Sequence, residues 1–308
     1  MKIYRDISEV KLERKSVVTI GTFDGIHLGH SDIINYVVSE AEEKNAESFV
    51  VTFEPHPRIV VQGNGDIKIL TALEEKAALF EKLNVKNLLV IEFNREFAQI
   101  SYDEFVKSYL IDRINAEHLV IGHDHHFGKN RGGNEESLLN LSKSLGYRLT
   151  VIPAVSVDGI QVSSSKIRNA LEAGNLESAN RMLGRNYSVK GIVVEGVQRG
   201  RELGFPTANI EPLSKQKLIP STGVYAVKCS IEGNLLKGVL NIGMRPTFEN
   251  SSRIIIELHI FGYSGDAYGK AVELEFVSRI RDEKKFGSVD ELVGQIKKDI
   301  EIAKQILN

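Results

Sequence analysis

Residues 21–30 (GTFDGIHLGH) contain side chains suited to phosphate chemistry. Residues 17–21 (VVTIG) predict a buried strand before them, and a helix is expected near 29–43. Glycines permit a tight turn and close backbone approach, and the positive end of a helix attracts anions. His27 and His30 can donate to phosphate oxygens at that position. The segment predicts a nucleotide triphosphate site, with packing or capping histidines as the alternative.

A second segment, 163–168 (SSSKIR), places hydroxyls and two cations before a helix expected at 167–173. Such a helix start can hold the β- and γ-phosphates from the opposite side, although plain serine capping is the alternative. Adenylyl transfer needs no covalent enzyme intermediate, because an acceptor oxygen attacks the α-phosphorus in line while pyrophosphate leaves. Positioning and charge stabilisation therefore suffice for that reaction.

Residues 196–210 (GVQRGRELGFPTANI) are neither a Walker A loop nor a dinucleotide-binding fingerprint. Their glycines and arginines predict a cationic loop able to cover phosphates. Thr207 and Asn209 are two apart on an extended segment, so they face the same side. A hydroxyl and an amide oxygen suit Mg²⁺ that also contacts ATP. A surface turn followed by a strand is the alternative.

In the strand predicted at 253–260 (RIIIELHI), Ile254, Ile256, Leu258 and Ile260 form one face. Glu257, the only carboxylate of the strand, lies on the opposite face with Ile255 and His259. An isolated strand carboxylate is usually just solvated. A kinase, however, needs an acceptor for the proton of the alcohol, and Asp or Glu commonly takes that role. Glu257 is therefore a candidate general base.

Strand and helix patterns alternate through the first half of the chain. Two apparent capping boxes, Thr71 with Glu74 and Ser101 with Glu104, predict helix starts between apolar runs. The apolar runs lie at 48–53, 87–91, 118–122 and 149–155. This alternation predicts a mostly parallel, doubly wound, Rossmann-like sheet with ligands at the carboxyl ends of its strands.

After about residue 184 the pattern changes to alternating strands, which predicts an antiparallel barrel. The expected strands are 187–195, 224–231, 236–242, 254–260 and 272–277. Ser288 and Glu291 open a terminal helix with apolar residues at helical spacing, which should pack on the barrel. The predicted domains are therefore 1–184 and 185–308.

Composition limits the possible partners. The net charge of −2 gives no reason to expect nucleic acid. No apolar run approaches the roughly 18 residues of a membrane span, and the first residues do not resemble a signal peptide. The only cysteine is Cys229, which fits a reducing compartment. We expect a cytoplasmic enzyme for small molecules, either a monomer or a weak homo-oligomer.

Together with 52–57 (TFEPHP) and 122–128 (GHDHHFG), the first two segments resemble the bacterial bifunctional riboflavin kinase/FMN adenylyltransferases, also called FAD synthetases. The resemblance implies that residues of the first two segments bind ATP and that His27, His30 and Arg168 are catalytic. The implied ATP-binding set is Gly21, Phe23, Asp24, Gly25, His27, Gly29, His30, Ser164, Ser165 and Arg168. The implied FMN cleft contains His56, Pro57, Asp124 and Phe127. His125 departs from the family pattern, which usually has an aromatic residue there.

Residues 200–209, 223–225, 241–247 and 281–286, with Glu257, resemble the riboflavin kinase module of the same family. The resemblance implies that Glu257 is the general base toward the riboflavin 5′-hydroxyl and that Thr207 and Asn209 hold Mg²⁺. The implied ATP-binding residues are Gly196, Gly200, Arg201, Gly204, Thr207 and Asn209. The implied riboflavin-binding residues are Tyr225, Glu257, Arg281 and Phe286.

The resemblance thus implies a sequential enzyme that converts riboflavin to FMN and FMN to FAD, with ATP in both steps. Two other interpretations stay open at this point. One is an H-x-G-H adenylyltransferase of other specificity fused to an unrelated barrel. The other is a flavin-binding regulatory protein without turnover, since fold alone does not establish function. The 123–126 cluster (HDHH) also invites a zinc hypothesis, which its alternating side-chain directions disfavour.

Overall fold

The computed structural model describes residues 1–308 except 63–66, 196–202, 247–251 and 264. The chain forms two compact units, Met1–Ser164 and Ser165–Asn308. This division comes earlier in the chain than the change of sequence pattern at residue 184. Residues 165–183 therefore belong to the second compact unit.

In the first unit, short strands and helices alternate along the chain. The strands are β1 (Lys2–Tyr4), β2 (Ser16–Ile20), β3 (Glu47–Glu54), β4 (Asn87–Glu92), β5 (Ala116–Gly122), β6 (Arg148–Ile152), β7 (Ser156–Val157) and β8 (Ile160–Gln161). The longer helical segments are α1 (Leu28–Glu43), α2 (Pro57–Gln62), α3 (Leu73–Lys82), α4 (Tyr102–Phe105), η3 (Val106–Ile111) and α5 (Glu135–Leu145). Single 3-10 turns occur at η1 (Ile7–Glu9), η2 (Phe97–Gln99) and η4 (Lys129–Arg131).

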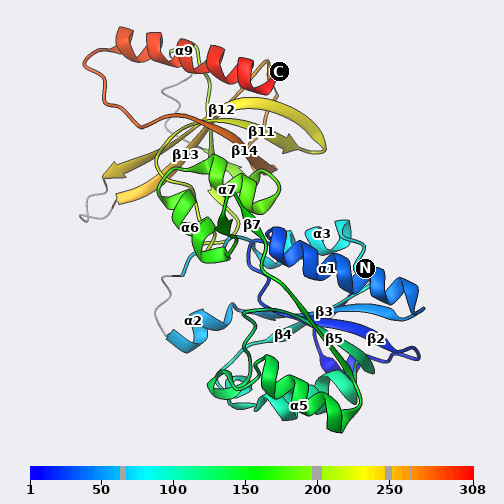
Figure 1. The fold of residues 1–308 in the computed structure, drawn as a ribbon. Helices are drawn as coiled ribbons and strands as arrows, with labels where there is room; N and C mark the ends of the chain where they lie inside the picture. The colour runs from blue at the N-terminus through cyan, green and yellow to red at the C-terminus, as the bar shows by residue number, and fades with distance from the viewer. Residues whose placement is uncertain (63–66, 196–202, 247–251, 264) are drawn as a thin grey trace. The chain divides into compact units, whose positions relative to one another are not determined.

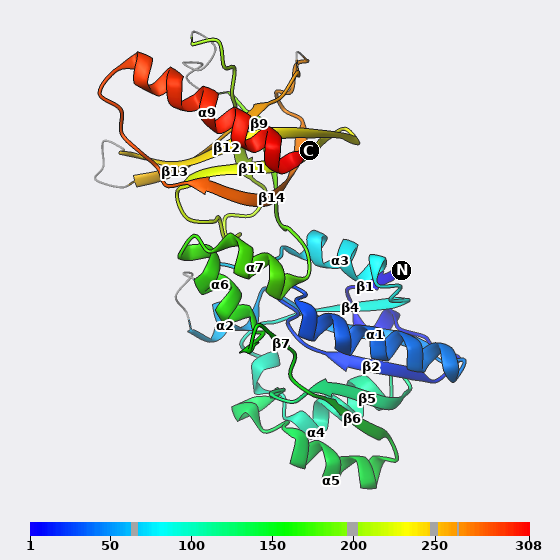
Figure 2. The same ribbon diagram turned by 45° about the horizontal axis from the view of Figure 1, so that its top comes forward.

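Strands β1 to β6 form a six-stranded sheet in the order β1-β4-β3-β2-β5-β6, and all of its pairings are parallel. Strands β7 and β8 pair separately as a two-stranded antiparallel sheet. Helices α1 and α3 lie along one face of the sheet, and α4 and α5 lie along the other (Figures 1 and 2). The predicted doubly wound architecture is confirmed. The chain passes from β2 to β3 and β4 on one side and to β5 and β6 on the other, so β2 and β5 flank the topological switch point.

Both faces of the sheet are buried, which explains why its strands are nearly continuous apolar runs. Alternate residues point to opposite faces. Val18 and Phe49 pack in the cluster that contains Phe105 of α4, whereas Val50 packs with Ile34 of α1 in another cluster. A shift of one residue in strand pairing would therefore still place apolar residues on both faces of the sheet. Packing against the helices on each face determines which residues point to which side.

The second unit begins with two helices, α6 (Ser164–Glu172) and α7 (Leu176–Leu183), and ends with α9 (Val289–Leu307). Between them lie β9 (Tyr187–Val194), β10 (Ala208–Pro212), β11 (Gly223–Ile231), β12 (Asn234–Pro246), β13 (Ser252–Ile260) and β14 (Ala271–Arg281). These strands close into a barrel in the order β10-β13-β12-β11-β14-β9, with antiparallel pairing throughout. The predicted barrel is confirmed.

Helix α9 covers part of the outer barrel wall, as Figure 1 shows. Ile300, Ala303 and Leu307 of α9 pack with Val224 and Val239 of the wall. Ser288 caps the helix by accepting from the Glu291 N–H at 3.2 Å, as its sequence predicts. The helix is therefore held to the barrel by the apolar face that the sequence pattern indicated.

Helices α6 and α7 also pack on the barrel unit. The Ser221 N–H donates to the Leu171 carbonyl at 3.1 Å. The Asn180 amide donates to the Phe276 carbonyl at 2.9 Å and accepts from the Tyr187 N–H at 2.8 Å. These bonds explain why the compact unit begins at Ser165.

One capping prediction is wrong. Helix α3 begins one residue later than expected, with the Glu75 carboxylate accepting from the Ala72 N–H at 2.9 Å. Thr71 instead uses its hydroxyl to bind the Gly25 N–H. The other expected cap is present, since Ser101 accepts from the Glu104 N–H at 3.4 Å. The error at Thr71 arises because a partner 46 residues away in the sequence takes its hydroxyl.

Within the described ranges, no helix combines the length and apolar character that crossing a membrane would require.

Candidate active sites

The Gly21–His27 loop joins β2 to α1 at the carboxyl edge of the sheet. It lies beside the switch point, and Gly122 at the end of β5 reaches the same edge. This is the place where open parallel sheets bind their ligands. Gly21 approaches the Phe23 ring so closely that an added Cβ would lie 3.1 Å from it. A side chain at residue 21 would therefore crowd the loop.

His27 caps α1, because its Nδ1 accepts from the His30 N–H at 3.3 Å. The two imidazoles stack with centroids 3.7 Å apart and planes 17° apart. The Phe23 ring meets the His30 ring edge-on at 5.2 Å. His27 is buried and His30 is half-buried at the helix start. The capping alternative is thus realised at His27, and the same geometry fixes both rings at the positive end of α1.

Asp24 is buried and its carboxylate points into the protein. One oxygen accepts from the Leu70 N–H at 2.8 Å and from the Thr71 N–H at 3.0 Å. Its backbone carbonyl accepts from the Ser164 hydroxyl at 2.8 Å. The structure therefore joins Ser164 of the second predicted segment to the first loop. Ser165 and Arg168 follow on α6 in the second compact unit.

Two charged groups lie at the same edge of the first unit. Lys76 of α3 is 3% exposed, and its ammonium donates to the Thr22 carbonyl at 3.2 Å. Burial lowers the pKa of Lys76, while the carboxylates of Glu54 and Asp24 oppose that shift. Burial raises the pKa of Glu54, and Lys76 opposes it. Neither group was singled out from the sequence, because a lysine inside a helical charge pattern looks solvent-exposed.

The 122–128 segment follows β5. Phe127 contacts Phe105 edge-on at 5.6 Å, and the ring of His125 lies 5.3 Å from that of Phe127. Burial lowers the pKa of His125 to about 4, so its imidazole is neutral at neutral pH. It occupies the usual aromatic position as an uncharged ring. Asp124, in contrast, is exposed.

The residues predicted for the FMN cleft after β3 form a short turn. His56 is buried, and its Nδ1 accepts from the Arg58 N–H at 3.2 Å. Pro57 begins α2, which is a position that proline tolerates because the first helical N–H groups have no intrahelical partner. Both residues lie at the carboxyl end of β3, next to β2 in the sheet.

The barrel unit places Glu257 and Asn209 on its outer wall. Glu257 of β13 pairs in register with Asn209 of β10 on one side and Asn241 of β12 on the other. Residues directly opposite in paired strands point to the same face. Ile256, Leu258 and Ile260 are buried, as the alternation predicted, whereas Ile254 near the start of the strand is 45% exposed. Glu257, Asn209 and Asn241 therefore form a polar row outside the barrel.

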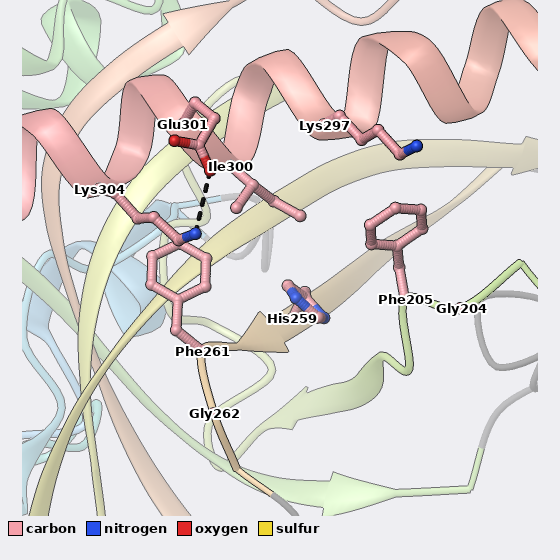
Figure 3. A pocket seen from close by; sticks show the side chains of 9 residues that line it. All are labelled: Gly204, Phe205, His259, Phe261, Gly262, Lys297, Ile300, Glu301 and Lys304. Carbon is pink, nitrogen blue, oxygen red and sulfur yellow. Dashed lines mark hydrogen bonds and ion pairs between the residues drawn. The ribbon is translucent and has the colours of Figure 1, made fainter.

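A pocket of about 500 Å³ opens on the outer wall of the barrel beside α9 (Figure 3). Its lining residues are Gly204, Phe205, His259, Phe261, Gly262, Lys297, Ile300, Glu301 and Lys304. The His259 Nδ1 donates to the Pro206 carbonyl at 2.9 Å, which ties β13 to the segment just before Thr207. His259 is two residues from Glu257, so both side chains leave the same face of β13.

Sequence reasoning missed the aromatic and basic lining of this pocket. The Phe205 and His259 rings lie 6.1 Å apart, and those of His259 and Phe261 lie 6.0 Å apart. Lys304 lies 6.0 Å from the Phe261 ring centroid. Two signals were available, since His259 shares a face with Glu257, and Lys297 and Lys304 are seven residues apart on one helix. Neither signal identifies a pocket without the closure of the barrel.

Three predicted riboflavin contacts have structural partners. Tyr225 is fully buried inside the barrel, and its hydroxyl donates to the Ser221 carbonyl at 2.6 Å. Arg281 binds the buried Asp299 of α9, with its Nη2 2.7 Å from Oδ2. Its guanidinium also lies 5.8 Å from the Phe286 ring centroid. Tyr225 thus packs the core, and Arg281 fastens α9 to β14.

Gly196, Gly200 and Arg201 lie outside the described residues, whereas Gly204 is described and lines the pocket. Among the residues that the structure describes, no group of three or more His, Cys, Asp or Glu side chains is arranged to hold a metal ion. The zinc hypothesis for 123–126 therefore has no ligand set there.

Two family models match the chain. The FAD synthetase model matches residues 9–166, and the riboflavin kinase model matches residues 183–307. A bifunctional riboflavin kinase/FMN adenylyltransferase from Bacillus subtilis is 40% identical over 291 residues, covering 93% of this chain and 91% of the relative. One of the same description from Haemophilus influenzae is 39% identical and covers 94% of each chain.

A crystal structure described as a macrolide-efflux protein from Streptococcus pneumoniae is also similar, with a TM-score of 0.90, 30% identity and 98% coverage of each chain. The relatives named above match this chain across both compact units. The predicted sheet and barrel are each present, and each carries the motifs of its own family model. The chain therefore belongs to the family of bifunctional riboflavin kinase/FMN adenylyltransferases, which phosphorylate riboflavin to FMN and adenylylate FMN to FAD.

Proposed function

We propose that the kinase reaction takes place on the outer wall of the barrel beside α9, with Glu257 as the general base. The single observation that carries this assignment is the register that places Asn209 directly opposite Glu257. It puts an amide suited to a metal ion and a carboxylate suited to a proton on one face. The aromatic and basic pocket begins two residues further along β13.

In this proposal the pocket receives ATP. The rings of Phe205, His259 and Phe261 suit a purine. Lys297 supplies positive charge for an anionic ligand, whereas the Lys304 ammonium is paired with Glu301 of the same pocket at 3.0 Å. Thr207 and Asn209 would hold Mg²⁺, which neutralises charge on the transferring phosphates when bound. The oxygens of both residues have the hardness that Mg²⁺ prefers.

The proposed reaction needs one proton acceptor. The riboflavin 5′-hydroxyl attacks the γ-phosphorus, Glu257 accepts its proton as the new O–P bond forms, and ADP leaves. Because Tyr225 is inside the barrel, we assign it to packing. Arg281 acts on the site only through α9 and Phe286, so we propose that Phe286 is the flavin contact of this segment.

We propose that adenylyl transfer takes place at the Gly21–His30 loop. The phosphate of FMN attacks the α-phosphorus of ATP, and pyrophosphate leaves. His30 donates to the developing charge at the positive end of α1, and His27 holds the helix start through its cap. Ser164, whose hydroxyl donates to the Asp24 carbonyl, would contact the leaving phosphates. The cleft of His56, Pro57, Asp124 and Phe127 would receive FMN.

The experiment follows both half-reactions chromatographically on one preparation of His30→Ala. Loss of a preorganised donor costs about 10²–10³ in rate, so FAD formation from FMN should fall by that factor. FMN formation from riboflavin should persist, since the barrel carries its own site. A fall of less than about tenfold in FAD formation would remove His30 from this role.

We further propose a cytoplasmic enzyme that acts on small molecules as a monomer or weak homo-oligomer, without nucleic acid or membrane. The single cysteine of the sequence supports a reducing compartment. Cys229 is buried in the barrel, and burial raises the pKa of its thiol to about 11. Such a thiol is mostly protonated and unreactive at neutral pH. Domain limits of 1–184 and 185–308 stay part of this proposal.

A further inference from the structure

The segment Leu70–Lys76 binds the Gly21–His30 loop by several hydrogen bonds. The Thr71 hydroxyl accepts from the Gly25 N–H at 2.9 Å, and the Lys76 ammonium donates to the Thr22 carbonyl at 3.2 Å. Between these two contacts, Asp24 accepts from the Leu70 and Thr71 N–H groups. The loop is therefore held at three residues, Thr22, Asp24 and Gly25, by a segment about 50 positions further along the chain.

The loop needs external support because its backbone is unfavourable. Phe23 has a φ of 46° and Ile26 has a φ of 37°. Both are bulky side chains in the left-handed region, which a residue other than glycine rarely adopts. Such a conformation persists only when contacts with the rest of the protein stabilise it. Here the buried side chains of Phe23 and Ile26 and the hydrogen bonds from residues 70–76 stabilise it.

Lys76 is an unusual residue for mere packing. A lysine is almost never fully buried unless it is paired, yet this one is 3% exposed. The Thr22 carbonyl that it binds also accepts from the Thr52 hydroxyl at 3.3 Å. Two donors from α3 and β3 thus converge on one carbonyl at the start of the loop. Glu54 and Asp24 provide the negative charge that balances the ammonium.

We propose that Thr71 and Lys76 are positioning residues for FAD synthesis, which hold the Thr22–Ile26 turn so that His30 and the helix start meet the ATP phosphates. This rests on the proposed role of the Gly21–His30 loop. Neither residue touches the reacting atoms. Their contribution is preorganisation, since a loop that must be ordered during the reaction gives up part of the transition-state stabilisation.

The test compares Thr71→Val, Thr71→Ser and Lys76→Met, with kcat/KM for ATP in FAD synthesis measured well below each unfolding midpoint. Thr71→Val removes the acceptor for the Gly25 N–H at nearly constant volume, whereas Thr71→Ser keeps it. We expect about a tenfold fall for Thr71→Val and for Lys76→Met, and recovery to within about threefold for Thr71→Ser. FMN formation at the barrel should not change.

Ser16→Ala is the matched control. The Ser16 hydroxyl is buried and donates to the Ile114 carbonyl at 2.7 Å, at the opposite end of β2 from the loop. Its loss should lower stability to a similar extent and leave FAD synthesis unchanged. Conversely, a positioning role predicts lower kcat/KM in the Thr71 and Lys76 variants at temperatures where they are fully folded.

Several outcomes would overturn the proposal. The first is that Thr71→Val and Lys76→Met both keep a kcat/KM for ATP within about twofold of the unsubstituted enzyme. The second is that kcat/KM falls as far in Thr71→Ser as in Thr71→Val. If Thr71→Val does not fold, Lys76→Met decides. His30→Ala, assayed in parallel, separates this inference from the site assignment. Normal FAD synthesis by His30→Ala refutes the proposed site. If His30→Ala loses FAD synthesis while the Thr71 and Lys76 variants keep it, only the positioning role is refuted.

Discussion

Glu257→Gln tests the kinase mechanism most directly. The substitution keeps the size of the side chain and removes the base. In the structure the residue stands outside the barrel between Asn209 and Asn241, and the core contacts of β13 come from its neighbours Ile256 and Leu258. The change should therefore alter folding stability by no more than about 0.5 kcal/mol.

Its effect on turnover should be much larger. A positioned general base contributes about 10²–10⁴ in rate, which corresponds to roughly 3–5 kcal/mol of activation free energy. Because the lost interaction develops mainly in the transition state, kcat for FMN formation should fall by that factor with little change in the affinities for riboflavin and ATP. Conversion of added FMN to FAD should be unaffected, since that reaction belongs to the other compact unit.

The assay separates riboflavin, FMN and FAD by chromatography after incubation with Mg-ATP. Glu275→Gln is the matched control, because Glu275 is an exposed carboxylate on β14 of the same barrel. It should keep both activities. Normal FMN formation by Glu257→Gln would show that the carboxylate is only solvated and would refute the reasoning. Loss of both activities would indicate misfolding, which thermal unfolding would reveal.

Three further predictions concern stability. Thr19 is buried in β2, and its hydroxyl has no hydrogen-bond partner among the described residues. Thr19→Val should therefore raise the free energy of unfolding, measured by urea titration, by about 1 kcal/mol. A lower free energy of unfolding would contradict this. Burial, aided by the nearby Arg148 charge, lowers the pKa of His118 to about 4, so the unfolded chain binds a proton at a higher pH than the folded protein does. The full contribution of neutral His118 to the free energy of unfolding should be present above pH 6.5 and should fall by on the order of 2–3 kcal/mol as the pH drops toward 4. The loss should be smaller in His118→Asn. A fragment 165–308 should unfold at a higher temperature than 185–308, because only the former keeps the α6 and α7 contacts with the barrel. Equal midpoints would show that these contacts do not stabilise the barrel.

Local sequence signals predicted most of the fold. The apolar runs at 48–53 and 118–122 became the buried strands β3 and β5, because strands covered on both faces must be apolar throughout. The period of two in 254–260 correctly placed Glu257 opposite the core residues. The prediction at Thr71 was wrong since its hydroxyl binds the distant Gly25, and a short-range motif contains no information about such a partner.

The sequence by itself determined which chemical groups are available: the histidines of the Gly21–His30 loop, the oxygens of Thr207 and Asn209, and the carboxylate of Glu257. It did so because residue type and local period depend only on neighbours in the chain. Tertiary structure decided which of these groups meet. Closure of the barrel pairs β10 with β13, and packing of α3 brings the Lys76 ammonium to the Thr22 carbonyl. Those contacts join residues about 50 positions apart, so only the packing of whole elements fixes them.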